Sequence, residues 1–524
     1  MAMIVCPQPQ AAEIGLDVMR RGGNAVDAAV TCAFVQGVVD PQMCGIGGCG
    51  VMLVHSPQSG DALLEFYATA GSRVREDQWE SIFVREAADR YGYVLDGWVN
   101  DVGYRSVAVP GTVAGLHEAL TRFGSISWEE AIEPAIPLAR HGFPVTGYMH
   151  GYWTMDYGPD VVPNAQRIQA TPAAKAIYTR AGRLYAIGEV MVQEDLARTL
   201  ERLASGGPDA FYKGEIAEEI ALDFEANGGF ITGEDLEGYR VNVTEPIRGT
   251  YRGLQVGAAG PPAGGLTLLQ MLNFLEGFDL AAHGWPSTEA ARLLVEAMAW
   301  ALADRQLHVA DPRFVEIPIG ALADKQYAAA ARQVVHDRPD TTHVCVVDEA
   351  GNAVSLSHTL GSASGVVTPG LGFGYNDYMN CFDPRPGRPN SIRPGKTRVT
   401  MMTPTMVFDG RKLRVCAGAP GGTKIVTAIL QVLVNVLDHE MSPVEAVSAP
   451  RVDFQGDVVQ AEARIPRVVC EGLERLGYAV NRRTLNYDSY FARPQLIVAE
   501  HDGFLSGASD PRKDGGAAFE TETK

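Results

Sequence analysis

The stretch that decides the fold of this chain is residues 341–360, which read TTHVCVVDEAGNAVSLSHTL. Two apolar runs flank a polar turn at Glu349–Asn352, a pattern that predicts a β-hairpin. In an antiparallel pair, the end of the returning strand lies beside the start of the outgoing strand. We therefore expect Thr359 to lie close to Thr341. A threonine is also an ordinary first residue of a strand, so spacing alone gives Thr341 no catalytic role.

The pattern of the chain changes near residue 340. Helical patterns dominate the segment 1–340, whereas short apolar strand runs dominate the segment 341–524. In the first segment we expect Asn24 to cap an apolar helix over 25–35, because asparagine is a preferred N-cap residue. In the second segment we expect the Pro- and Arg-rich stretch 383–394 to form a surface loop or lid.

The composition excludes several classes of protein. Of 524 residues, 46% are hydrophobic, and 44 basic against 63 acidic side chains give a formal net charge of −19. Such a chain is globular rather than disordered or collagen-like. An acidic surface repels phosphate backbones and anionic lipid, so we expect no nucleic acid and no membrane partner. No apolar run reaches the length of about 18 residues that a membrane-spanning helix needs.

The cysteines and the first residues bear on the cellular compartment. Eight cysteines occur without a Cys-x-x-Cys pair, which is typical of buried, reduced thiols in a cytoplasmic protein. They are Cys6, Cys32, Cys44, Cys49, Cys345, Cys381, Cys416 and Cys470. Residues 1–12 have a short apolar start, no basic region and an early Pro7, unlike a secretory signal. We expect a cytoplasmic location, no metal site and no cofactor.

Two glycine-rich stretches have the composition of anion-binding loops. Gly45–Gly50 precedes a strand-like run, whereas a phosphate-binding loop follows a strand and opens a helix, so we expect only a tight loop there. Gly418–Thr423 leaves a strand and enters a helix, where successive amide groups can stabilise a developing oxyanion. Judged alone, this second stretch is better explained as a plain strand-to-helix turn.

Motifs spread over nearly the whole chain resemble those of the γ-glutamyltransferase family of N-terminal nucleophile hydrolases. The motifs of the first segment are Gly22–Ala29, Gly45–Gly48, Val109–Gly115, Leu138–Phe143, Phe211–Gly214, Gly264–Gly265 and Ala303–Arg305. Those of the second segment are Thr341–His343, Asp348, Gly351–Val354, Pro420–Gly422 and Gly507–Arg512. No single glycine cluster is specific, but the number and order of the motifs are.

The resemblance implies an α+β fold, the four-layer αββα sandwich of the N-terminal nucleophile hydrolases. It also implies an inactive precursor, a zymogen, that cuts itself between Asp340 and Thr341. The products would be a large subunit, 1–340, and a small subunit, 341–524, that remain together as a heterodimer and form one αββα unit.

The same resemblance implies the catalytic roles. Thr341 would be the nucleophile, Thr359 would orient the new N-terminus, and Gly421 and Gly422 would donate amide hydrogens to the oxyanion. A free α-amine has a pKa of about 7.7–8.0, so it can act as the base for the hydroxyl of its own residue. An acyl-threonine intermediate would then pass its acyl group to water or to an amine.

The acyl pocket departs from the family pattern. A typical member binds a glutamyl zwitterion with an arginine, two serines, an asparagine, a glutamine or glutamate, and an aspartate. The residues aligned with these anchors carry no charge and are Tyr67, Thr400, Met401, Gly361, Tyr378 and Cys381. Loss of a bidentate arginine–carboxylate pair weakens the binding of such a substrate strongly. We therefore expect a self-processing amidohydrolase or acylase that cleaves a small-molecule amide and has no γ-glutamyl activity.

Three alternatives remain at this point. The chain could be an authentic γ-glutamyl transpeptidase, or glutathione hydrolase, with a different alignment of the pocket. It could be a hydrolase of dicarboxylate monoamides such as oxamate, with Arg393 and Arg398 near Thr400 recognising the free carboxylate. It could also be an uncleaved, inactive homologue that serves as a binding protein.

Overall fold

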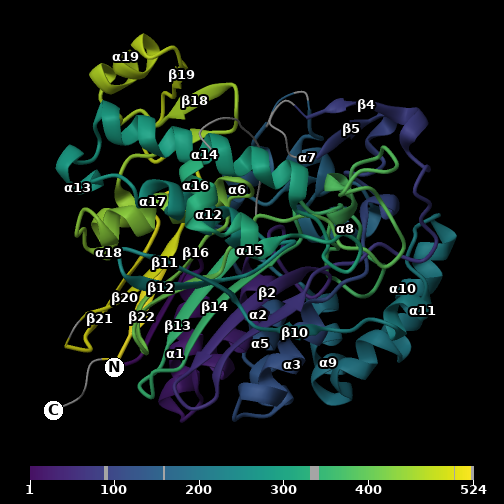
Figure 1. Cartoon of the computed structure of the whole chain (residues 1–524). Helices are drawn as coiled ribbons and strands as arrows, with labels where there is room; N and C mark the ends of the chain where they lie inside the picture. The colour runs from purple at the N-terminus through teal and green to yellow at the C-terminus, as the bar shows by residue number, and fades with distance from the viewer. Residues whose placement is uncertain (88–91, 157, 159, 331–341, 501, 521–524) are drawn as a thin grey trace.

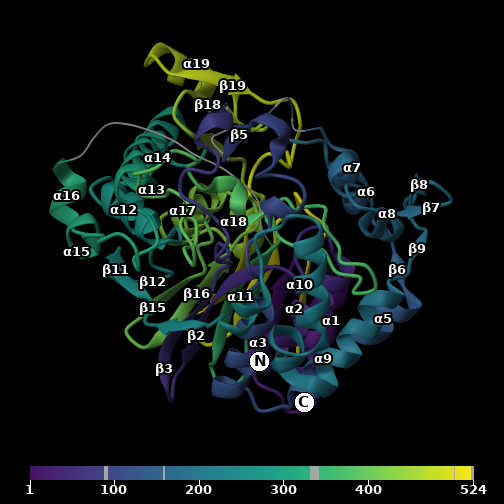
Figure 2. The same ribbon diagram turned by 90° about the vertical axis from the view of Figure 1, so that its right-hand side faces the viewer.

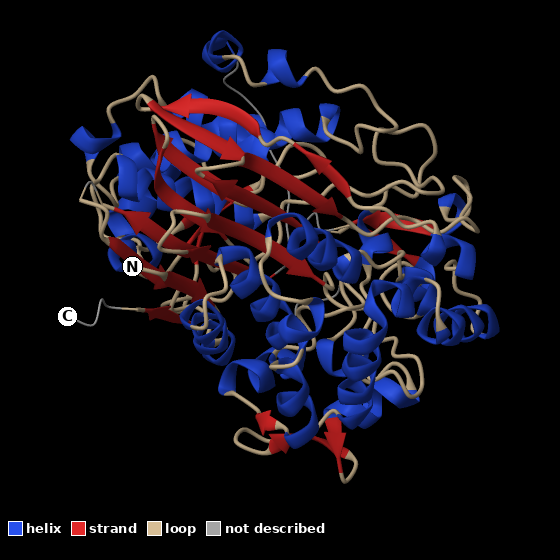
Figure 3. Cartoon of the chain, turned by 90° about the horizontal axis from the view of Figure 1, so that it is seen from below, coloured by secondary structure: helices blue, strands red, loops and turns tan. Residues whose placement is uncertain are grey.

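Two stacked β-sheets between layers of helices form the core of the protein (Figures 1 and 3). The computed structural model describes residues 1–87, 92–156, 158, 160–330, 342–500 and 502–520. The layers are those of the αββα sandwich, so the expected fold class is confirmed.

The first sheet has seven antiparallel strands, and it takes them from both segments of the chain. In spatial order they are β10 (Asn242–Thr244), β3 (Gly60–Phe66), β2 (Cys49–Ser56), β14 (Ala353–Thr359), β13 (Thr342–Val347), β1 (Met3–Cys6) and β22 (Gly516–Phe519). The central strands β2, β13 and β14 are buried along almost their whole length, because both faces of this sheet are covered.

The second sheet has six antiparallel strands and also combines both segments. In spatial order they are β11 (Ile247–Tyr251), β12 (Leu254–Ala258), β15 (Thr405–Asp409), β16 (Lys412–Gly418), β20 (Gln495–Ala499) and β21 (Leu505–Ser509). Strands β16 and β20 pack on β13 of the first sheet, and an apolar cluster that includes Cys345, Met406 and Ile497 fills the space between the sheets.

Helices close the two outer faces. The seven-stranded sheet is covered by α1 (Pro9–Arg20), α2 (Ala25–Val39) and α3 (Thr112–Phe123). The six-stranded sheet is covered by α12 (Gly265–Leu275), α17 (Lys424–Leu437) and α18 (Pro443–Ser448), and α14 (Thr288–His308) packs outside α12.

The remaining elements lie around this core, and Figure 2 shows α6 to α8 with the β7–β8 hairpin on one side of it. The helices are α4 (Trp128–Ile132), α5 (Ala135–His141), α6 (Gly147–Thr154), α7 (Asn164–Arg167), α8 (Pro172–Tyr178), α9 (Glu194–Tyr212), α10 (Glu215–Ala226), α11 (Gly233–Glu237), α13 (Leu280–His283), α15 (Ile319–Leu322), α16 (Lys325–Ala330) and α19 (Arg467–Arg475). The short 3-10 turns are Glu80–Ile82, Asp96–Trp98, Tyr104–Ser106 and Tyr378–Cys381. The minor strands are β4 (Phe83–Glu86), β5 (Tyr93–Leu95), β6 (Phe143–Pro144), β7 (Thr179–Arg180), β8 (Arg183–Leu184), β9 (Val190–Met191), β17 (Val452–Phe454), β18 (Val458–Ala461) and β19 (Ala479–Arg482).

The hairpin predicted from residues 341–360 is confirmed. Its register pairs Thr342 with His358 and Val347 with Ala353. The turn closes where the Asp348 amide donates to the Asn352 carbonyl at 3.0 Å.

Two other local predictions are confirmed. The Asn24 side chain accepts from the amides of Val26 and Asp27, and the Asp27 carboxylate accepts from the Asn24 amide, which forms a capping box at the start of α2. All eight cysteines are buried and free of disulfide bonds. Burial raises the pKa of the Cys6 and Cys49 thiols to about 12, so these thiols stay protonated.

Candidate active site

Thr359 lies at the end of β14, beside the start of β13. It pairs with Cys49 of β2 and is 2% exposed. Its Oγ1 accepts a hydrogen bond from the Gly361 amide at 2.8 Å, which fixes the side chain. Asp340 and Thr341, the predicted cleavage point and nucleophile, lie outside the described residues. The prediction that Thr341 lies close to Thr359 depends on the register of the hairpin. That register is the observed one, in which Thr342 pairs with His358.

The glycine-rich turn between β16 and α17 reaches the same end of the hairpin. The Gly418 Cα faces the His343 imidazole so closely that a Cβ would lie 2.0 Å from the ring, and Ser355 donates to the Ala417 carbonyl at 3.0 Å. The end of β16 therefore lies against the start of β13. A site that combines Thr341 with this turn requires such an arrangement.

Gly421 and Gly422 have the backbone conformation that glycine permits. Their φ angles are 139° and 64°, and a Cβ on Gly421 would lie 2.3 Å from Ala492 Cα. Among the described residues, no oxygen accepts a hydrogen bond from either amide. Because α17 begins just after them, its dipole adds to the attraction that these amides exert on a negative charge.

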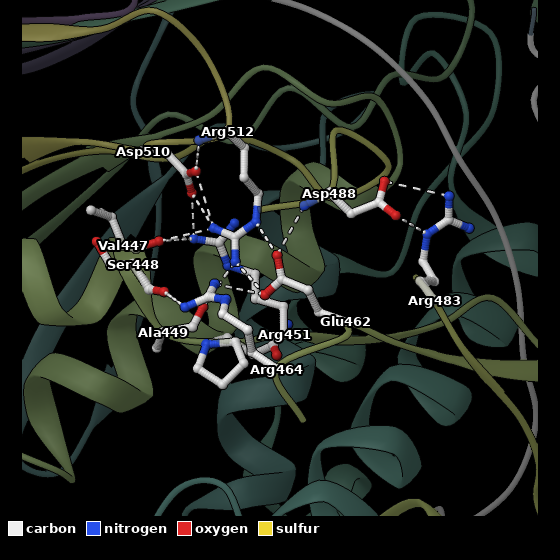
Figure 4. A network of polar contacts seen from close by, with 12 residues as sticks. Val447, Ser448, Ala449, Arg451, Glu462, Arg464, Arg483, Asp488, Asp510 and Arg512 are labelled. Carbon is white, nitrogen blue, oxygen red and sulfur yellow. Dashed lines mark hydrogen bonds and ion pairs between the residues drawn. The ribbon is translucent and has the colours of Figure 1, made fainter. Parts of the chain in front are cut away.

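A buried network of charged side chains, which Figure 4 shows around Arg451, Asp510 and Arg512, contacts the segment that packs against this turn. Arg451 donates to the Ala492 carbonyl at 2.6 Å and pairs with Asp510, which also binds Arg512. The Arg493 amide, next to Ala492, donates to the Pro420 carbonyl at 2.8 Å. Burial, and the neighbouring charge of Arg512, lower the pKa of Arg451 to about 10. Arg451 thus holds the segment against which the Gly421 turn packs.

A cavity of about 200 Å³ opens beside the turn. Three of the six predicted substrate-binding residues line it, namely Cys381, Thr400 and Met401, and so does Thr423, which follows Gly422. The cavity therefore joins the predicted acyl pocket to the predicted oxyanion donors.

The other three predicted residues lie deeper. Gly361 lies two residues after Thr359, whereas Tyr67 and Tyr378 are buried between the sheets and the cavity wall, with exposures of 6% and 0%. Within the described part of the chain, the Tyr67 phenol oxygen has no hydrogen-bond partner, whereas the Tyr378 hydroxyl lies against Thr400 and Cys49. The Arg398 guanidinium stacks on the Tyr378 ring, 3.9 Å from its centroid.

The cavity wall differs from the uncharged pocket that the sequence suggested. It contains Arg305, Arg385 and Arg388 together with two carboxylates, Glu86 and Asp383. These charged residues lie outside the aligned anchor positions: Arg305 comes from α14, Glu86 from β4, and the other three from the loop 383–394. That loop, expected as a surface loop or lid, forms part of the wall.

The three arginines differ in the hydrogen bonds and ion pairs that they form with the protein. Arg305 is buried and donates to the Thr400 carbonyl at 2.9 Å, so it fixes the backbone of a predicted pocket residue. Arg385 pairs with Asp383 and Glu86, each at 2.8 Å. The Arg388 side chain is 55% exposed, and its Nε lies 3.6 Å from Asp383. Arg393 pairs with Glu76 at 3.3 Å and does not line the cavity.

His343, a buried histidine at the start of β13, has a structural role. His343 is fully buried, its Nδ1 lies 2.8 Å from Ser357 Oγ, and burial lowers its pKa to about 3. It stays neutral and points toward β16, so it is no candidate base for Thr341. In the described part of the chain, no group of three or more His, Cys, Asp or Glu side chains is arranged to hold a metal ion, and no described helix is long and apolar enough to span a membrane.

Comparison with known proteins gives consistent matches along the chain. A sequence profile of the family described as Gamma-glutamyltranspeptidase matches residues 11–520. The Acylase ACY 1 proenzyme of Pseudomonas sp. (strain V22) is 37% identical over 532 residues, covering 98% of this chain and 92% of the relative. The Glutathione hydrolase proenzyme of Escherichia coli (strain K12) is 34% identical over 543 residues, covering 97% and 90%. The crystal structure of cephalosporin acylase from Bacillus halodurans superposes with a TM-score of 0.90 at 28% identity, covering 99% and 96%.

Proposed function

Because the chain belongs to the gamma-glutamyltranspeptidase family, we propose that it is a self-processing acylase that cleaves a non-glutamyl amide through an acyl ester on Thr341. The observation that carries this proposal is the convergence of three features at one end of the hairpin. They are the Thr359 side chain, the amides of Gly421 and Gly422, which donate to no oxygen of the described residues, and the cavity lined by Thr400.

The first reaction would be the cut within the chain itself. The Thr341 hydroxyl adds to the Asp340 carbonyl, the peptide C–N bond breaks, and the Thr341 nitrogen takes a proton to become a free amine. Water then hydrolyses the resulting ester, which leaves segments 1–340 and 341–524. Both sheets interleave strands from the two segments, so the products remain associated as a heterodimer.

Turnover would repeat this chemistry on a substrate. The Thr341 amine takes the proton of its own hydroxyl, the oxygen adds to the substrate amide, and Gly421 and Gly422 stabilise the oxyanion. The amine part of the substrate then leaves with the proton from the Thr341 amine, and water hydrolyses the acyl ester on Thr341. Thr359, held by the Gly361 amide, would orient the Thr341 amine.

The wall of the cavity points to the class of substrate. None of the six aligned anchor positions carries a charge, so a glutamyl zwitterion has no matched partner there. Three guanidinium groups against two carboxylates leave the wall with one excess positive charge. We propose an N-acyl amine in which the acyl group, or the amine it leaves, carries a carboxylate. The Bacillus halodurans structure is described as a cephalosporin acylase, and an N-acyl cephalosporin nucleus carries such a carboxylate.

A panel of p-nitroanilides tests the proposal. The acyl groups would be γ-glutamyl, glutaryl, phenylacetyl and hexanoyl, and mass spectrometry of the small fragment would follow acylation of Thr341. We expect the glutaryl compound to turn over fastest and the γ-glutamyl compound to be slow. Fastest turnover of the γ-glutamyl compound would support the transpeptidase alternative instead.

A hydrolase of small dicarboxylate monoamides is the second candidate, because the excess positive charge of the wall also suits a short dicarboxylate. Ammonia release from oxamate under the same conditions separates the two. The acylase proposal predicts none.

A further inference from the structure

A buried ion pair joins the two segments of the chain directly behind Thr359. Arg167 ends α7 in the first segment and is 1% exposed, and Asp377 in the second segment is fully buried. Arg167 Nη1 lies 3.6 Å from Asp377 Oδ2, and Arg167 Nη2 donates to Asp101 Oδ2 at 2.6 Å. One arginine thus faces two carboxylates, and Arg398 is a second cation that acts on Asp377.

Both members of the pair bind the loop that follows Thr359. The Ser362 amide donates to Asp377 Oδ1 at 3.1 Å, and the Asp377 amide donates to the Leu360 carbonyl at 3.0 Å. Arg167 Nη1 donates to the Ala363 carbonyl at 2.9 Å. The loop therefore has its backbone fixed from two sides, by groups that lie far apart in the sequence.

This loop needs such support because its backbone is strained at Ala363. The φ angle is 73° at Gly361, 66° at Ala363 and 71° at Gly365. Alanine is disfavoured in the left-handed region, so its conformation persists only where surrounding contacts enforce it. The Arg167 bond to the Ala363 carbonyl is such a contact.

The loop in turn sets the Thr359 hydroxyl. The Gly361 amide, held between Leu360 and Ser362, donates to Thr359 Oγ1 at 2.8 Å. A shift of Gly361 would therefore rotate or release the side chain that the proposed mechanism uses to orient the Thr341 amine.

We propose that Asp377 and Arg167 are positioning residues that fix the Thr359 hydroxyl through the 360–363 loop, and thereby set the rates of self-cleavage and of substrate acylation. This inference rests on the proposed function, because it assigns the pair to the same site. Neither side chain contacts the reacting atoms. Their contribution is the geometry of Thr359.

The contacts predict which substitutions matter. Asp377→Ala removes the acceptor of the Ser362 amide, and Arg167→Met removes the donor to the Ala363 carbonyl. Asp377→Asn keeps an acceptor for Ser362. Its new NH2 group would meet Asn380 Nδ2, which now donates to Asp377 at 3.0 Å. Because Asn380 Oδ1 has no partner in the described part of the chain, the Asn380 amide can turn and accept.

The test follows self-cleavage of the full-length precursor on denaturing gels, and then kcat, KM and Tm of the matured enzyme. Asp377→Ala and Arg167→Met should slow cleavage and lower kcat at least about 10-fold with KM nearly unchanged, since small displacements of reacting groups cost that much. Asp377→Asn should restore both rates to near the wild-type values.

Asp438→Ala is the matched control. The Asp438 side chain is only 4% exposed, pairs with Arg252 at 2.7 Å, and lies at the far end of α17 from the glycine turn. The Asp438→Ala substitution should lower Tm but leave self-cleavage and kcat unchanged.

Three results would overturn the inference. If folded Asp377→Ala protein keeps the wild-type rates, the inference is wrong while the proposed function stands. The same holds if Asp377→Ala and Arg167→Met lose no more rate than Asp438→Ala does at a matched drop in Tm. A wild-type chain that neither cleaves itself nor hydrolyses any amide would contradict the proposed function, and this inference with it.

Discussion

Replacement of Gly421 by alanine perturbs the predicted oxyanion site at one backbone position. A Cβ at this position would lie 2.3 Å from both Ala492 Cα and Cβ, whereas real Cβ contacts stay beyond 3.0 Å, so the turn must move by roughly 0.7 Å. The φ of 139° is also unfavourable for alanine. Ala492 cannot yield easily, because Arg451 holds its carbonyl at 2.6 Å.

The expected loss follows from that displacement. Removal of one oxyanion donor costs about 2.7–4 kcal/mol of transition-state stabilisation, or roughly 10²–10³ in kcat. A shift of about 0.7 Å should weaken the Gly421 and Gly422 donors without abolishing them, so we expect kcat to fall about 10²-fold. The assay is p-nitroaniline release from the best substrate of the panel, with self-cleavage followed separately on gels.

Gly410→Ala provides the matched control. Gly410 has a φ of 60° in the turn between β15 and β16, and a Cβ there meets nothing within 4 Å. It introduces backbone strain without a clash and far from the cavity, so Tm should fall while kcat stays unchanged. If Gly421→Ala retains wild-type kcat, or loses no more than Gly410→Ala, Gly421 has no role as an oxyanion donor.

Three further changes have expected outcomes. Arg451→Met should lower the free energy of unfolding by about 3–5 kcal/mol, because it leaves Asp510 buried without one of its two arginine partners, and urea unfolding measures this. Thr359→Val should lower kcat and slow self-cleavage while Thr359→Ser restores both, since serine keeps an acceptor for the Gly361 amide; equal rates in all three proteins would contradict the role of the hydroxyl. Burial raises the pKa of Asp377 from 3.8 to about 7, so between these values the folded chain holds a proton that the unfolded chain has lost, and stability from this group falls as pH rises. Asp377→Asn should therefore gain in Tm relative to wild type between pH 5 and pH 8, and a gain that does not change with pH would contradict this titration.

The local elements could be predicted from the sequence because their causes are local. The hairpin follows from two apolar runs around a tight turn, and the start of α2 follows from Asn24 and Asp27, which cap each other. The glycine turn before α17 could be located too. Its role as an oxyanion site could not be predicted, because the sequence of a glycine pair is the same whether its amides are hydrogen-bonded or free.

The cavity wall could not be predicted, because it is assembled over long distances in the sequence. Arg305 reaches it from α14, and Arg385 is held there by Glu86, about 300 positions earlier. The ion pair that supports Thr359 is likewise formed by residues far apart in the sequence, since Arg167 and Asp377 are separated by 210 positions. Alignment against known anchors examines single positions, so it indicates which charges are missing and not which charges replace them.

The most direct test of the central claim is the intact mass and N-terminal sequence of the purified protein and of its Thr341→Ala variant. The wild-type chain should yield two fragments, 1–340 and 341–524, the second beginning with Thr341, and the variant should remain one chain of 524 residues. A wild-type chain that remains whole, or a cut that persists in Thr341→Ala, would contradict the assignment of Thr341 as the nucleophile.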